Sequence, residues 1–138
     1  MSLTTVSSAE KAQLARAAGA DSVIDYRRDD VATRVHKATD GQGVDRIIEV
    51  DVAANGALDV DLLRTGGDCV VYGSGAAQFM LPFFPLIVKS VTFRFFIVFN
   101  LDADDRRRAI ATLTAFLRDG ATARQELCNY RINLDLRV

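Results

Sequence analysis

The sequence predicts an α/β domain built on a mostly parallel sheet with helices on both of its faces. Short apolar segments rich in β-branched residues alternate with helical segments whose capping residues are visible, which is the pattern of strand–helix–strand units. The segment RIIEV at residues 46–50 is apolar almost throughout, as in strands that helices cover on both sides. With 138 residues and 49% hydrophobic composition, the chain forms one core rather than two.

Capping residues mark where the first two helices begin. Ser7 followed three residues later by Glu10 is a capping box, and it predicts a first helix over residues 8–18. Asp29 and Asp30 open the second helix, because an aspartate side chain accepts hydrogen bonds from the free N–H groups of a first helical turn. Glycines follow both helical segments and end them.

The later helices are predicted in the same way. Asn55 is expected to cap a third helix over residues 56–64. Residues 79–86 are interrupted by prolines and predict a loop with a short helix that starts at a proline. A long helix begins at Asp102 and reaches about residue 118. Its apolar side chains are expected to face inward, namely Ile110, Leu113, Phe116 and Leu117.

The strands lie between these helices. Each is a run of apolar, β-branched or aromatic residues bounded by glycine, aspartate or serine. We expect them, after a first strand that ends at Val6, at residues 22–26, 46–50, 69–72, 90–100 and 126–132. Their alternation with helices at this spacing makes the expected fold Rossmann-like.

The turn after the first strand suggests an anion site. In dinucleotide-binding α/β folds an acidic residue at this position binds the ribose hydroxyls and repels a 2′-phosphate, but here the sequence reads Val6-Ser7-Ser8. Lys11 follows one turn into the helix, and Tyr26 ends the next strand. Hydroxyls, helix N–H groups and an ammonium would favour a phosphate monoester by about 2–4 kcal/mol. The sequence therefore predicts NADP(H) rather than NAD(H).

A plainer interpretation of the same residues stays open. In this interpretation Ser7 caps the helix and binds no ligand, and Lys11 is a solvated surface residue. Arg27 and Arg28 are then ordinary surface charges. Taken singly, each residue fits this interpretation better. Their combination at the carboxyl ends of neighbouring strands, where α/β folds bind ligands, favours the anion site.

Three segments, in this order and spacing, resemble a known family: SSAEKAQLARAAGADSVIDYR, TDGQGVDRIIEV and LLRTGGDCVVYGS. They resemble the cofactor-binding domain of the medium-chain dehydrogenase/reductases, in the branch of the zinc-free NADPH:quinone oxidoreductases. The resemblance extends from about Val6 to about Leu134. It implies an oxidoreductase that transfers hydride from NADPH to a quinone or an α,β-unsaturated carbonyl.

The resemblance also implies site residues. Lys11 and Tyr26 match positions that contact the 2′-phosphate and the adenosine ribose in that family, and Ser7 or Ser8 belongs to the same site. The turn after VVYGS lies beside the nicotinamide half of the coenzyme in the family. The turn after RIIEV departs from the family's Asp-x-Val-Gly pattern, so contacts there are carried over only weakly. The candidates from the turn at VVYGS are Gly73 and Ser74. Those from the turn after RIIEV are Asp51 and Asn55.

Partners and location follow from the same features. Residues 90–100 resemble the family's edge strand, and a long apolar edge needs a partner, so we expect a homodimer through Ser90–Asn100. The formal net charge of −1 argues against nucleic acid as a partner. No apolar run approaches the roughly 18 residues of a membrane span, and Cys69 and Cys128 are expected as buried thiols in a cytoplasmic protein.

The departures from the family are as informative as the matches. The strand with which the family's domain begins, and the glycine-rich phosphate loop after it, are expected to be missing from this chain. Gly41-Gln42-Gly43 follows a helix, and Gly73-Ser74-Gly75 has no third glycine. We therefore expect residues 4–138 to form a partial dinucleotide-binding domain that is inactive by itself, with residues 1–3 as a remnant of expression. No catalytic residue can be named. No metal is expected, because His36 is the single histidine.

Two other classes of function remain as alternatives. A phospho-receiver-like signalling domain would use Asp51, after one strand, as the phosphoacceptor. Ser74 follows the next strand, and Lys89 precedes the strand after that. Such a domain needs an acidic pair after its first strand to bind Mg²⁺, and Val6-Ser7-Ser8 offers none. The other alternative is a non-catalytic module that dimerises or binds a nucleotide.

Overall fold

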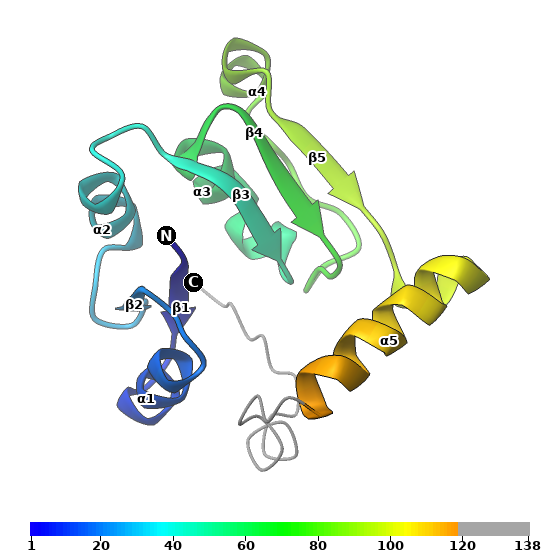
Figure 1. Ribbon diagram of the computed structural model, residues 1–138. Coiled ribbons are helices and arrows are strands. Elements are labelled where there is room, and N and C mark those ends of the chain that lie inside the picture. Colours follow the sequence, from blue (N-terminus) through cyan, green and yellow to red (C-terminus); the bar gives the residue numbers. More distant parts are fainter. Residues whose placement is uncertain (119–138) are drawn as a thin grey trace.

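The computed structural model describes residues 1–118. The strand expected at residues 126–132 and the thiol of Cys128 lie outside the described residues. The elements alternate as expected (Figure 1). In chain order they are β1 (Leu3–Val6), α1 (Ala9–Ala17), β2 (Ser22–Asp25), α2 (Val31–Ala38), β3 (Val44–Glu49), α3 (Val52–Leu62), β4 (Leu63–Val71), α4 (Phe83–Lys89), β5 (Thr92–Phe95), the 3-10 turn η1 (Val98–Asn100) and α5 (Ala103–Arg118).

All strand pairs are parallel, which confirms the predicted fold class. β1 pairs with β2, and β3, β4 and β5 pair in that order. In the register of the larger sheet, Glu49 lies opposite Val71 and Val71 lies opposite Phe95, so its three strands end at one level. Among residues 1–118, β1 pairs only with β2, and β3 pairs only with β4, so the two sheets share no strand-to-strand ladder there.

Three apolar clusters hold the two sheets and their helices together. In the first, Ala12 and Ala15 of α1 pack on Val6 and Val23. The second joins Ile24 of β2 to α2, to the end of α3 and to β3, so that it connects the two sheets. In the third, side chains of β4 pack against the start of α3. The described residues contain no helix that is both long enough and apolar enough to cross a membrane.

Two of the predicted helix caps are wrong. The cap of α1 is Ser8 and not Ser7, because Ser8 has extended backbone angles and its Oγ accepts the N–H of Lys11. Asn55 does not cap α3, which begins at Val52; Asn55 lies inside the helix with its side chain directed into the core. The sequence pattern misses this start because Asp51, the residue before α3, makes no side-chain cap bond.

The segment expected as one strand over residues 90–100 is also different. β5 spans only Thr92–Phe95, because β4 ends at Val71 and its carbonyl accepts the last bond, from the N–H of Phe96. Beyond that point the backbone has no ladder partner and turns into η1. α5 has the predicted bounds, but it extends away from the sheets (Figure 1). Its expected inward side chains are 43–60% exposed, namely Ile110, Leu113, Phe116 and Leu117.

Candidate functional site

The residues predicted for the site lie at the carboxyl ends of the parallel strands, in two groups. The first half-site consists of Ser7, Ser8, Lys11 and Tyr26, which follow β1 and β2. The second half-site consists of Asp51, Gly73 and Ser74, which follow β3 and β4. The carboxyl ends of parallel strands are where α/β folds bind ligands.

The first half-site presents an ammonium and a hydroxyl at the start of α1. Ser8 Oγ accepts the N–H of Lys11 at 3.3 Å, so this hydroxyl is already used as the cap. The Ser7 hydroxyl makes no hydrogen bond to any residue in the range 1–118 that the structure covers. Lys11 is half-buried, and it forms no ion pair within the same range. An anion at this helix terminus would therefore meet a positive charge that is engaged in no ion pair among residues 1–118, with Glu10 as the acidic residue of the same first turn.

Tyr26 borders the same half-site from the end of β2. Its N–H donates to the carbonyl of Val6 at 3.1 Å, which ties the turn after β2 to the turn after β1. The ring is partly buried against the cluster that contains Ile24. Arg28 lies 3.7 Å from the carboxylate of Asp25, while the side chain of Arg27 is exposed. The half-site therefore combines a fixed aromatic ring with nearby positive charge.

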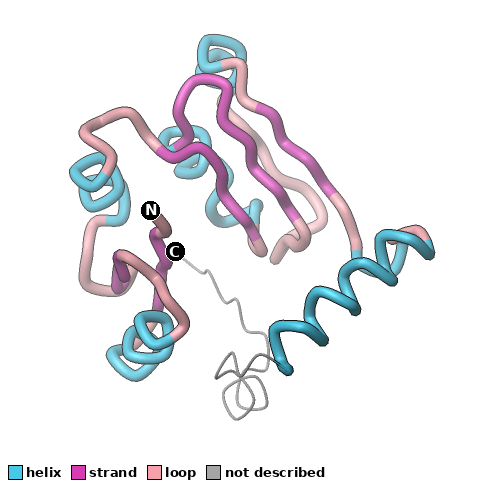
Figure 2. The backbone as a smooth tube through the Cα atoms, viewed as in Figure 1, coloured by secondary structure: helices cyan, strands magenta, loops and turns pink. Residues whose placement is uncertain are grey.

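The second half-site is a clamp between the turns after β3 and β4. The N–H of Tyr72 donates to the carbonyl of Glu49 at 3.0 Å, and the N–H of Gly75 donates to Asp51 Oδ1 at 2.6 Å. A Cβ on Gly73 would lie 2.3 Å from the carbonyl oxygen of Val50, so only glycine allows this approach. The two turns end side by side in Figure 2. The clamp leaves Ser74 exposed at the tip.

A buried polar cluster lies beneath this clamp. It consists of four side chains, each at most 4% exposed: Glu49, Asn55, Asp59 and Cys69. The Asn55 amide donates to both oxygens of Glu49, at 3.1 and 3.2 Å, and the N–H of Asp51 donates to Glu49 Oε1. Asp59 forms a side-chain hydrogen bond with Glu49, and the Cys69 thiol lies 4.0 Å from Asp59 Oδ2. Every member is thus linked to Glu49 directly or through Asp59.

Burial decides the protonation of this cluster. Desolvation, together with the charge of Glu49, raises the pKa of Asp59 to about 8. Glu49 has a pKa raised by the same burial, but it accepts N–H bonds from Asp51 and Asn55 that favour its ionised form. At neutral pH the proton of the pair therefore resides on Asp59. Burial and the two carboxyl groups raise the pKa of Cys69 to about 12, so it stays a thiol.

The structure separates the predicted residues into surface and interior. Asp51, Gly73 and Ser74 come together in the clamp, whereas Asn55 is 2% exposed and bonds to Glu49. The sequence analysis missed Glu49 and Asp59 as members of the site. A signal for both existed: Glu49 is the single carboxylate of RIIEV, and Asp59 lies between the apolar residues Leu58 and Val60 of a helical segment. Such carboxylates are seldom buried without a polar partner.

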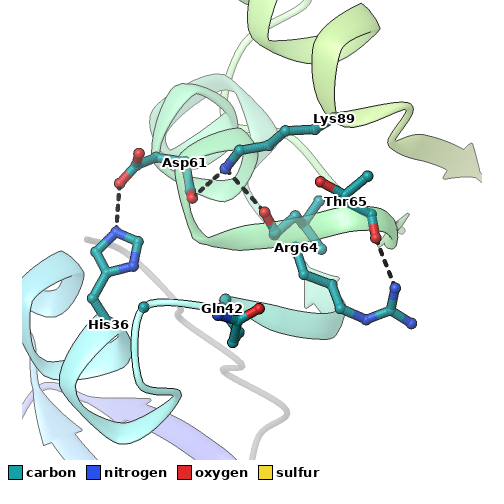
Figure 3. A pocket seen from close by; sticks show the side chains of 9 residues that line it. His36, Gln42, Asp61, Arg64, Thr65 and Lys89 are labelled. Carbon is teal, nitrogen blue, oxygen red and sulfur yellow. Dashed lines mark hydrogen bonds and ion pairs between the residues drawn. The ribbon is translucent and has the colours of Figure 1, made fainter.

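A pocket of about 290 Å³ lies at the opposite, amino ends of β3 and β4. His36 Nε2 is 3.1 Å from Asp61 Oδ2, and Lys89 Nζ donates to the carbonyl of Asp61 (Figure 3). Lys89 Nζ donates to the carbonyls of Val60 and Leu63 as well, each at 2.9 Å. These bonds close the last turn of α3, where a cation is favourable. The bonds of Lys89 in this pocket are therefore those of a cap at the end of α3, and we assign no ligand to it.

The described residues do not provide a metal site. No group of three or more His, Cys, Asp or Glu side chains within residues 1–118 could hold an ion. The His36 ring lies 3.1 Å from the carboxylate of Asp61, and Cys69 is a buried thiol with a raised pKa. A zinc ion needs three or four such ligands around one point.

The known proteins that this chain resembles are dehydrogenases and reductases. The family model described as zinc-binding dehydrogenase matches residues 3–115. A 2-haloacrylate reductase from Burkholderia sp. is 39% identical over 76 residues, which are 54% of this chain and 23% of that protein. Among solved structures, a 2-haloacrylate reductase matches with a TM-score of 0.71 and 28% identity over 86% of this chain and 38% of its own. The alcohol dehydrogenase of Aeropyrum pernix gives 0.71 and 26%, over 86% and 33%. The chain thus spans between 23% and 38% of these relatives.

Proposed function

The chain belongs to the zinc-binding dehydrogenase family, as part of the cofactor-binding domain of a medium-chain dehydrogenase/reductase, and from that premise we propose that it is the NADP(H)-binding portion of an oxidoreductase. The proposal takes its coenzyme preference from the first half-site. Lys11 stands unpaired among the described residues beside Ser7, and the turn after β1 carries no carboxylate. An acidic side chain there would favour NAD(H), so its replacement by hydroxyls and an ammonium supports the 2′-phosphate.

The second half-site is proposed to receive the nicotinamide half of the coenzyme. Gly73 lets the backbone approach closely, and Ser74 stands exposed beside it. When bound, the coenzyme supplies hydride, and the protein supplies orientation and electrostatics. Asp51 is proposed to act by holding the turn, and Asn55 by supporting Glu49 beneath it. The described residues contain no group that we assign as a catalytic acid.

The proposed substrate is an α,β-unsaturated carbonyl compound, with a quinone as the alternative. The curated relative and one of the solved structures are named 2-haloacrylate reductases, and a haloacrylate is an unsaturated carboxylate. Hydride addition to a conjugated double bond needs no metal to form its nucleophile. We derive no step through zinc, since the residues of the described part do not form a zinc site.

A homodimer and a cytoplasmic location belong to the same proposal. Within the described part of the chain, β5 has a strand partner only on the β4 side, and apolar side chains follow it. The most exposed apolar residues of this segment, named here the β5–η1 surface, are Phe95, Ile97, Val98 and Phe99, at 49–78% exposure. Neighbouring exposed apolar side chains of this kind favour association. A dimerisation module without catalysis would use the same surface, so coenzyme binding separates the two functions.

Equilibrium titration of the chain with NADPH and with NADH, followed by nicotinamide fluorescence, tests the coenzyme assignment. We expect NADPH to bind at least about 10-fold tighter, because one charge-assisted phosphate contact contributes 1.5–3 kcal/mol in typical sites. Equal affinities would contradict the 2′-phosphate assignment. Binding of neither coenzyme would favour the module without catalysis.

A further inference from the structure

The buried cluster beneath the second half-site has a connected path to its surface. Asp59 hydrogen-bonds to Glu49, and Glu49 Oε1 accepts the N–H of Asp51. The carboxylate of Asp51 in turn accepts the N–H of Gly75 at 2.6 Å. The path thus runs from a carboxyl group that is 4% exposed to the exposed turn of residues 73–76 in three links.

Each link depends on the one below it. Glu49 accepts the N–H of Asp51, and the Asn55 amide donates to both oxygens of the same carboxyl group. Both bonds are stronger when Glu49 is ionised. A neutral Asp59 donates its proton to Glu49 and shields that charge. An ionised Asp59 would instead repel Glu49 between two side chains that are 4% and 2% exposed, where repulsion between charges is poorly screened. Movement of the Glu49 carboxylate away from Asp59 would lower this repulsion, and it would also break the bond from the N–H of Asp51.

We propose that Asp59 is a positioning residue: in its protonated form it holds Glu49, and through Glu49 and Asp51 it fixes the turn of residues 73–76. Ionisation of Asp59 releases the turn. Where that turn receives the nicotinamide half of the coenzyme, coenzyme affinity follows the protonation of Asp59. This last consequence alone rests on the proposed function.

The charges around Asp59 favour its protonated form. Among residues 1–118, the ionisable groups that face Asp59 are Glu49 from β3, Cys69 from β4, and Tyr72 and Asp51 from the turns, and none of these four is a cation. The Lys89 ammonium lies at the other end of α3, where three carbonyls already bind it. The raised pKa of Asp59 places its ionisation at about 8.

Carboxyl ¹³C chemical shifts of the whole chain, recorded from pH 5 to 10, test the coupling without any ligand. We expect the Asp59 carboxyl to titrate near pH 8, and the Asp51 carboxyl and the backbone carbons of Gly75 to inflect at the same pH. In Asp59→Asn the inflection at Asp51 and Gly75 should vanish, since an amide still donates to Glu49 but does not ionise. Asp61→Asn, an exposed carboxylate on the same helix, should keep it.

Two results would overturn the proposal: Asp59 titrating below about pH 6, or Asp59 titrating near pH 8 while Asp51 and Gly75 stay constant. Because the first measurement uses the unmodified chain, it decides even if a variant fails to fold. NADPH titrations at pH 6.5 and 9.5 form a second arm. We expect affinity to fall by about 10-fold in the parent and in Asp61→Asn but to change less in Asp59→Asn, as is typical of coupled sites. If NADPH binds at neither pH while the shifts move together, the proposed function fails and the positioning role stands.

Discussion

The carboxylate of Asp51 accepts the backbone N–H of Gly75 at 2.6 Å, and this bond joins the turn after β3 to the turn after β4. Two neighbouring strands of a parallel sheet thereby present one rigid surface at their carboxyl ends. Asp51 is also held from the interior of the protein, because its backbone N–H donates to the buried carboxylate of Glu49. A surface that must bind a coenzyme gains orientation from such support.

Gly73→Ala should destabilise the fold by about 2–4 kcal/mol, because its Cβ would lie 2.3 Å from the carbonyl oxygen of Val50 and the clamp would have to open. Urea denaturation measures the change in the free energy of unfolding. Gly41→Ala is the matched control: a Cβ there meets nothing within 4 Å, and only its φ of +76° costs about 1 kcal/mol. Equal losses in the two variants would show that the close approach at Gly73 does not matter.

Asp59→Asn should change how stability depends on pH. In the parent the folded-state pKa of Asp59 is about 8 and its ordinary value is 3.8, so the folded chain keeps a proton that the unfolded chain has lost. Between these values its contribution to stability falls by up to ~1.4 kcal/mol per pH unit as pH rises, and above about pH 8 the loss is complete. In Asp59→Asn this part of the pH dependence of the free energy of unfolding should be absent, because an amide does not ionise.

Urea denaturation of both proteins at pH 5, 7 and 9 measures the difference. The free energy of unfolding of Asp59→Asn should gain on that of the parent from pH 5 to pH 9. Asp61→Asn should follow the parent, because Asp61 is exposed. Profiles of the parent and Asp59→Asn that stay parallel would show that Asp59 is ionised in the folded protein.

The β5–η1 surface should make the chain a homodimer. Light scattering coupled to size-exclusion chromatography is expected to give twice the mass of 15.1 kDa. Phe99→Asp places a charge at a side chain that is 78% exposed on this surface, and it should produce a monomer. Met80→Asp, at 92% exposure outside the surface, should remain dimeric. A monomeric parent at high concentration would refute the dimer.

Lys11→Ala should weaken NADPH binding by about 10- to 100-fold, which corresponds to one charge-assisted phosphate contact, while NADH binding should barely change. Lys37→Ala removes an exposed lysine from α2 and serves as the control for net charge. If both variants lose affinity equally, Lys11 acts only through the overall charge of the protein.

The fold class and most helix starts could be predicted from local patterns. The Asp30 cap of α2 and the bounds of α5 follow from short-range chemistry that does not depend on the rest of the fold. The end of β5 could not be predicted, because residues 96–100 are as apolar and aromatic as the strand before them. β5 ends where its neighbour β4 ends, and that limit is a property of the sheet rather than of the segment.

The site divides in the same way. Ser7, Lys11 and Tyr26 could be placed near one another because they follow strands whose carboxyl ends lie at the same edge. Asn55 was misplaced because an asparagine that caps a helix and one that serves a buried carboxylate have the same local sequence. Only the fold brings Asn55, Glu49 and Asp59 together, from positions up to ten residues apart.

Calorimetric titration of the chain with 2′,5′-ADP and with 5′-AMP tests the NADP(H) assignment most directly, because the two ligands differ only in the 2′-phosphate and need the first half-site alone. We predict that 2′,5′-ADP binds and that 5′-AMP binds at least about 10-fold more weakly. Equal binding of the two ligands, or binding of neither, would contradict a 2′-phosphate site at Ser7 and Lys11.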